Sequence, residues 1–147
     1  MTNNSAIAFK TDRIEKEFYS DEWHTQTRGL ARELARVTAL WFRKKLVITC
    51  IIRTMDEQLA VYQNQLDKEL TTLEKIRISP HLVKRTSEGQ MLFPCYAFDQ
   101  SIIGYSPTEI DRLVLWGNHY WKRCDGKETC FMHDIGSGGH IHWQFKT

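Results

Sequence analysis

The sequence contains no long hydrophobic run, and this absence excludes a membrane-spanning helix of ordinary length. Residues 1–5 are polar, and no apolar segment of the kind found in signal peptides follows them. We therefore expect a cytoplasmic protein that does not insert into a membrane. Any action outside the cell would then need a separate release step.

Charge of one sign is also scarce, because 20 basic residues face 18 acidic ones and leave a net charge of only +2. So small an excess does not argue for a nucleic-acid partner. Internal repeats and low-complexity segments are missing as well. With 147 residues, of which 41% are hydrophobic, the chain suits one domain with one packed core.

Cysteine is sparse, and its spacing argues against a zinc knuckle without closing that alternative. Cys50 and Cys95 lie in apolar stretches, which predicts core positions for both. Cys124 and Cys130 have the spacing of half a zinc site, but a second close pair is missing. In a reducing compartment we expect four free thiols.

Hydrophobic periodicity predicts three main helices, over residues 26–43, 55–69 and 106–122. The third begins at Ser106-Pro107-Thr108-Glu109, which has the pattern of a capping box with proline in the first turn. A polar stretch over residues 78–90 predicts a loop.

Apolar runs predict strands over residues 46–52 and in the second half of 91–98. A glycine-rich turn joins two further strands, 131–135 and 140–145, into a hairpin. The mixture predicts a single small α+β domain, with a mainly antiparallel sheet and helices packed mainly on one face.

The last predicted strand carries two of the six histidines. His140 and His142 are separated by one residue, so their side chains point to the same side of the sheet. Two imidazoles on one face suit a metal site or an acid–base pair, although an exposed strand can also carry two solvated histidines.

Two upstream segments offer further ligands. Ser79-Pro80-His81 follows a helical segment, and Asp99 ends an apolar strand, where an ordinary turn residue is the alternative interpretation. His81, Asp99 and one of the final histidines would together supply two imidazoles and a carboxylate. That set is typical of a zinc site with three protein ligands and a fourth position for water.

These segments resemble, in this order, the LAS-type zinc peptidases, which include D-Ala-D-Ala carboxypeptidases and phage L-alanyl-D-glutamate endolysins. The family carries Ser-x-His, Ala-x-Asp and a final His before an aromatic residue, and the matching segments are Ser79-Pro80-His81, Ala97-Phe98-Asp99 and His142-Trp143-Gln144. An upstream strand ends at Arg53, and the helix after it carries Gln58 and Tyr62, as in the family. The resemblance covers residues 26–146.

The resemblance implies a fold like that of hedgehog and the D-Ala-D-Ala peptidases, and a role for each matched residue. His81, Asp99 and His142 would bind Zn²⁺, and zinc-bound water would hydrolyse amide bonds of peptidoglycan stem peptides. Arg53 would hold the developing oxyanion or a substrate carboxylate, which suits a bidentate cation, although an Arg that caps a strand end is the alternative. Gln58 and Ser79 would support the site.

The same resemblance implies the setting in which the chain acts. Its partners would be peptidoglycan peptides, and the protein would be a monomer. A phage-encoded enzyme of this kind would wait in the host cytoplasm and act on the cell wall after release. The expected division is an N-terminal extension over residues 1–25 and a zinc peptidase domain over residues 26–147.

Two departures from the family pattern stand out. The stretch between His81 and Asp99 is much longer than in the family, which predicts an inserted flap around residues 82–96, where Glu88 or Arg85 would contact substrate. Gly139 stands where many members have a carboxylate, so we expect His140 to act as the acid–base residue. His133 and Asp134 are reserve candidates for that role.

Two other functions remain open at this stage. The chain could be a non-catalytic zinc-binding module for wall peptides or a virion component of the same fold, because the family's usual carboxylate is missing. A small metal-dependent nuclease is a third hypothesis, against which the weak net charge and the lack of a basic stripe count.

Overall fold

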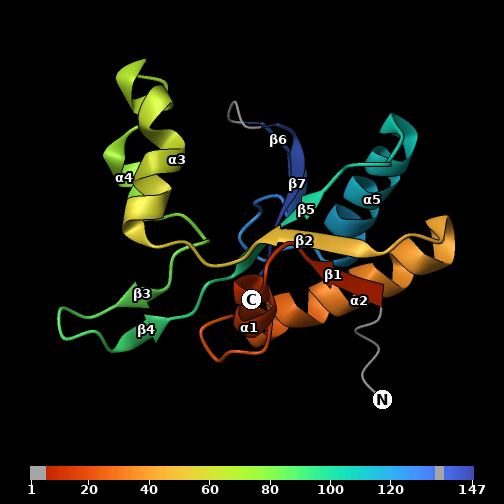
Figure 1. The fold of residues 1–147 in the computed structure, drawn as a ribbon, viewed down its shortest axis with the longest axis horizontal. Helices are drawn as coiled ribbons and strands as arrows, with labels where there is room; N and C mark the ends of the chain where they lie inside the picture. The colour runs from red at the N-terminus through yellow and green to blue at the C-terminus, as the bar shows by residue number, and fades with distance from the viewer. Residues whose placement is uncertain (1–5, 135–137) are drawn as a thin grey trace.

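The computed structural model describes residues 6–134 and 138–147, which form a single α+β domain (Figure 1). A five-stranded sheet and a separate two-stranded hairpin make up its β-structure within these ranges. The strands are β1 (Ile7–Phe9), β2 (Leu46–Cys50), β3 (Lys84–Arg85), β4 (Met91–Phe93), β5 (Ala97–Ser101), β6 (Cys130–His133) and β7 (His140–Gln144). The helices are α1 (Asp12–Phe18), α2 (Thr25–Phe42), α3 (Met55–Asp67), α4 (Leu73–Arg77) and α5 (Pro107–Tyr120).

The five-stranded sheet has the order β1-β2-β5-β7-β6, so β5 is its central strand. Only the β1–β2 pair is parallel, and the other three pairs of this sheet are antiparallel. The prediction of an α+β domain with a mainly antiparallel sheet is therefore confirmed.

One face of the sheet is covered by the hydrophobic core. Phe98 of β5 stacks on Trp143 of β7, with the rings nearly parallel and their centroids 6.0 Å apart. Gly117 brings α5 so close to β7 that an added Cβ would lie 2.4 Å from the Trp143 ring. Side chains of α2, among them Leu30 and Leu34, are fully buried in the same core. The opposite face of β5 and β7 is left to polar side chains.

The N-terminal residues belong to the same sheet and core. β1 pairs with β2, and Phe18 and Trp23 are buried. Residues 6–25, which fall in the predicted N-terminal extension, thus contribute a strand and core side chains to the domain.

The local elements follow the sequence signals, with several additions. The capping box at Ser106 begins α5, as its pattern predicts, because the Ser106 hydroxyl and the Glu109 carboxylate satisfy each other's backbone N–H groups. The additions are β1, α1, α4 and the β3–β4 hairpin. Of these, β3 lies in the stretch predicted as a polar loop, and β4 lies in the first half of the apolar run over residues 91–98. The glycine-rich turn between β6 and β7 includes residues 136 and 137, which lie outside the described residues.

No helix in the described ranges is both long and apolar enough to span a lipid bilayer.

Candidate metal centre

The register of the sheet gathers polar side chains on the face opposite Trp143. Asp99 of β5 lies directly opposite His142 of β7, and His140 lies opposite His133 of β6. Since every second side chain of a strand points the same way, His140 and His142 share a face with Asp99. Strand pairing alone therefore gathers these residues on one side of the sheet.

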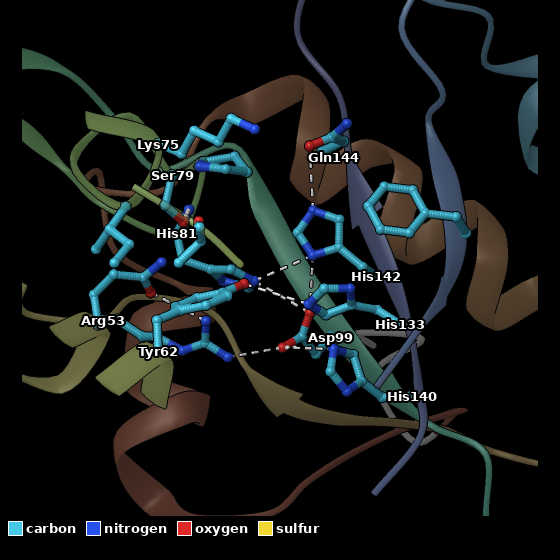
Figure 2. A pocket seen from close by; sticks show the side chains of 15 residues that line it. Arg53, Tyr62, Lys75, Ser79, His81, Asp99, His133, His140, His142 and Gln144 are labelled. Atoms are coloured by element: carbon cyan, nitrogen blue, oxygen red, sulfur yellow. Dashed lines mark hydrogen bonds and ion pairs between the residues drawn. The ribbon is translucent and has the colours of Figure 1, made fainter. Parts of the chain in front are cut away.

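His81 completes a tight cluster from outside the sheet (Figure 2). Its Nε2 lies 3.1 Å from Oδ1 of Asp99 and 3.3 Å from Nδ1 of His142, and the latter two atoms are 3.1 Å apart. The three residues are at most 7% exposed. Three candidate ligand atoms thus converge on one buried point.

The second nitrogen of His81 is already engaged. Nδ1 of His81 lies 2.6 Å from the backbone carbonyl oxygen of Ile51. A carbonyl oxygen only accepts hydrogen bonds, so Nδ1 carries a proton and donates it. In the neutral ring, Nε2 therefore presents a lone pair to Asp99.

His142 is oriented in the same way by Gln144. The Gln144 amide nitrogen donates to the carbonyl oxygen of Glu128 at 2.9 Å, which turns its Oε1 toward His142. Nε2 of His142 lies 3.2 Å from that oxygen and must be the donor. Nδ1 of neutral His142 then also presents a lone pair to the centre.

Two lone pairs and a carboxylate oxygen facing one another repel unless a positive charge lies among them. A proton or a metal ion can supply that charge. For a tetrahedral zinc site with bonds of about 2.0–2.1 Å, ligand atoms lie about 3.3 Å apart. The observed 3.1 to 3.3 Å separations fit that spacing, so the donor set suits the cation.

The pKa shifts at the centre agree with the need for a positive charge among these groups. Burial opposes a charged His81, but the Asp99 carboxylate and the Cys50 sulfur outweigh burial and raise the pKa of His81 to about 10. Burial likewise opposes a charged Asp99, yet His81 and His142 hold the pKa of Asp99 well below its usual value. A positive charge beside Asp99 is therefore favoured on the His81 side, whereas burial lowers the pKa of His142.

The second oxygen of Asp99 faces two other groups. Nη2 of Arg53 donates to Oδ2 at 3.2 Å, and Nε2 of His140 lies 3.5 Å from the same oxygen. Gln58, the one fully buried side chain of α3, accepts from Nη1 of Arg53 at 3.1 Å. Asp99 therefore links His81 and His142 on one side to Arg53 and His140 on the other.

Cys50 adds a candidate sulfur ligand that the sequence did not indicate. Ligand atoms of Cys50, His81 and Asp99 all lie within 4.8 Å of one another, and this group can hold a metal ion. Cys50 approaches the Nδ1 edge of His81, with its Sγ 3.8 Å from that nitrogen, whereas Asp99 and His142 meet the Nε2 edge. Its half-buried position also differs from the core position predicted for it.

The cluster opens into a hollow of about 190 Å³ between the sheet and the helices α3 and α4. Arg53, His140 and His142 line it together with Tyr62 and His133, whose side chains meet at 3.3 Å. Burial raises the pKa of Tyr62 and lowers that of His133. Both histidines of β7 thus face space in which a substrate can lie.

Some of the other predicted site residues line this hollow and others do not. Ser79 lines it, and its hydroxyl accepts from the backbone N–H of His81. Glu88 is exposed in the turn of the β3–β4 hairpin and is not among the residues that line the hollow. Cys124 is exposed and Cys130 is buried, and neither belongs to the group that can hold a metal.

In comparisons with known proteins, no family model matches the chain, and no curated protein or solved structure is significantly similar to it.

Proposed function

We propose that this protein is a zinc-dependent peptidase that hydrolyses amide bonds of peptidoglycan stem peptides. One observation carries the proposal: His81, Asp99 and His142 converge within 3.3 Å, and both histidines are oriented by hydrogen bonds on their outer nitrogens. Outer partners of this kind are typical of histidines that bind zinc. The substrate class is taken from the resemblance to the LAS-type peptidases.

His81, Asp99 and His142 would hold the metal, and His81 and Asp99 are shared with the group that contains Cys50. We favour His142 over Cys50 as the third ligand, because His142 meets the edge of His81 that also faces Asp99. A bound zinc ion supplies a Lewis acid and lowers the pKa of a coordinated water toward neutrality.

Arg53 and His140 are suited to the rest of the reaction. The Arg53 guanidinium is permanently charged and lines the hollow, so it can donate to a carbonyl oxygen on which negative charge develops. His140, on β7, lies near the same Asp99 oxygen that Arg53 binds. There its imidazole can hold a proton and pass it to the leaving amine.

A digest of purified peptidoglycan tests this proposal. The zinc-loaded protein is incubated with the wall, and new termini are identified by mass spectrometry beside a chelator-treated sample. We expect new amino groups at one stem-peptide bond that appear only with zinc. Intact stem peptides from several wall types, with one zinc still bound per chain, would refute the peptidase and leave a binding module.

Two variants separate the roles within the site. His140→Ala should keep its zinc and lose most hydrolysis, by about 100-fold or more, because a positioned acid–base residue contributes that much. The matched control is His119→Ala, since His119 is exposed on α5 and does not line the hollow. Full activity of His140→Ala would remove His140 from the mechanism.

A further inference from the structure

A second, larger groove lies beside the hollow of the metal centre, between the start of α3, the end of α4 and the β3–β4 hairpin. Its volume is about 620 Å³. Arg53 lines both the groove and the hollow. The two spaces also share a wall, because His81 lines the hollow and the next residue, Leu82, lines the groove. A ligand in the groove therefore lies next to the metal centre.

The charges along the groove are mostly of one sign. Its lining contains four cationic side chains and one acidic one, which are Arg53, Arg77, Lys84, Arg85 and Glu22. Glu22 is neutralised by its ion pair with Arg85. Arg53 is likewise paired, with Asp99. Two cations, Arg77 and Lys84, are left against no free carboxylate in the lining, so the groove favours a negatively charged ligand.

Arg77 is the cation most free to meet such a ligand. It is exposed at the end of α4, and its guanidinium makes no hydrogen bond or ion pair with any described residue. Lys84 is held nearby, because its ammonium group donates to the backbone carbonyl of Arg77 at 2.7 Å. That bond ties the hairpin to α4 and places both charges at one side of the groove.

The uncharged part of the lining distinguishes between classes of anionic ligand. It is largely aliphatic, with Leu82, Val83 and Leu92 among its members, and none of the described residues that line it is aromatic. Single-stranded nucleic acids bind through bases stacked on aromatic rings, for which this groove offers no platform. A peptide that combines carboxylates with short alkyl groups matches both the charge and the aliphatic surface.

We infer that the groove is a binding site for an acidic peptide, in which Arg77 and Lys84 hold carboxylates of the substrate beyond the bond to be cut. This inference deepens the proposed peptidase function and rests on it in one respect, because the bound peptide is a substrate only if the protein is a peptidase. The binding itself does not depend on hydrolysis, so it can be measured separately.

The test uses two synthetic probes, acetyl-Ala-Glu-Glu-Ala and acetyl-Ala-Gln-Gln-Ala. Binding to the full chain is followed by titration calorimetry and by backbone-amide NMR shifts. We expect the glutamate peptide to bind at least about fivefold more tightly than the glutamine peptide, and less tightly as salt is added. The shifts should concentrate on residues 52–55 and 82–85.

Arg77→Gln should weaken binding of the glutamate peptide by about fivefold. The matched control is Arg36→Gln, which removes the same charge from the exposed surface of α2 and should leave binding unchanged. Equal binding of the two peptides, or an Arg77→Gln variant as good as the parent chain, would overturn the inference. Tighter binding of an oligothymidylate than of the glutamate peptide would overturn it in favour of nucleic acid.

A third variant keeps this inference apart from the proposed function. His142→Ala should lose zinc and hydrolysis while it still binds the glutamate peptide. If the parent chain binds the peptide but leaves peptidoglycan intact, the proposed peptidase function is refuted and the proposed peptide site is supported. If it cuts peptidoglycan but does not prefer the glutamate peptide, the proposed peptide site is refuted and the proposed peptidase function is supported.

Discussion

The candidate metal centre and the arm formed by α3, α4 and the β3–β4 hairpin lie side by side, and α3 and α4 border the same hollow as the centre, yet the two regions are built differently. At the centre, Asp99 is 3% exposed and both of its oxygens have partners. In the arm, α3 buries only Gln58 among its 13 residues, and Leu70 and Leu92 are 70% and 67% exposed. Two of the candidate ligands, Asp99 and His142, are thus positioned by paired strands, whereas the arm is lightly packed.

This difference teaches where precision is needed. Ligand atoms must lie within a few tenths of an ångström of their ideal places, and the central strands of a sheet provide that rigidity. Recognition of a flexible peptide tolerates adjustment, so aliphatic and cationic side chains on a thinly supported arm suffice. If this comparison is right, substitutions in the two regions should affect different measurements.

The largest effect is expected from Asp99→Asn. The change removes the one carboxylate of the ligand set, and we expect zinc affinity to fall by about a thousandfold or more. Arg77→Gln, in the arm, should leave zinc affinity unchanged. Zinc content measured by mass spectrometry after dialysis checks both variants, with circular dichroism to confirm the fold. Unaltered zinc binding by Asp99→Asn would place the metal elsewhere.

The packing beneath the centre can be tested without touching a ligand. Gly117→Ala would bring a Cβ to 2.4 Å from the Trp143 ring and 2.6 Å from the Cys130 sulfur, and should lower the free energy of unfolding by about 3 kcal/mol. Gly29→Ala is the matched control in α2, because its Cβ would meet nothing closer than 3.8 Å. It should be neutral or stabilise by about 0.5 kcal/mol. Urea unfolding measures both, and a harmless Gly117→Ala would contradict the close approach.

A milder effect is expected from the residue that orients His142. Gln144→Ala removes the acceptor for Nε2 of His142 and should weaken zinc binding by about 10- to 100-fold. Gln144→Glu keeps an acceptor there and should restore much of the affinity. Gln90→Ala, in the exposed hairpin, serves as the control. A competition titration with a chromophoric chelator gives the affinities, and equal values for all three variants would show that the orientation is unimportant.

The smallest effect is expected where α1 meets the arm. Arg13 bonds Glu57 at the start of α3, and this hydrogen bond is the main cause that lowers the pKa of Glu57 from 4.5 to about 2. A lowered carboxyl pKa stabilises the fold above pH 4.5, and this contribution is lost as the pH falls from 4.5 toward 2. Because both side chains are partly exposed, Arg13→Gln should cost only about 0.5 kcal/mol at pH 6.

The difference between Arg13→Gln and the parent chain should therefore shrink as urea unfolding is repeated at pH 4 and pH 3. Lys68→Gln provides the control, since Lys68 forms no ion pair with a described residue. A difference that grows on acidification would contradict the assignment to Glu57.

Strand periodicity was enough to predict part of the centre. It put His140 and His142 on one face, and pairing with β5 puts Asp99 on that face as well. It could not give the orientation of His81, which depends on the backbone carbonyl of Ile51, a group that every residue has. Nor could it give the nearness of Cys50, which follows from an irregular register between β2 and β5. The roles of the ligands stay predictions that the variants above test, and the role of Arg53 stays a prediction as well.

The arm was harder to predict for a different reason. α4 has only five residues, too few for a helical period to show, and the β3–β4 hairpin pairs short polar and apolar segments across a turn. The groove depends on how these short elements pack against one another. Local sequence patterns do not specify that packing. The cationic residues of the groove, scattered over residues 53–85, only become neighbours in the fold.

The position of β7 in the sheet has a consequence for how the protein is made. β7 is the last strand in sequence, yet it lies between β5 and β6 rather than at an edge. During synthesis, residues of β5 and β6 leave the ribosome before the strand that must join them, so the cluster of His81, Asp99 and His142 cannot form until residue 142 has emerged and inserted. If these three residues hold the metal as proposed, metal uptake should coincide with the final step of folding. A nascent chain that stops after β6 keeps only Cys50, His81 and Asp99 of the candidate ligands and should hold zinc more weakly than the full chain.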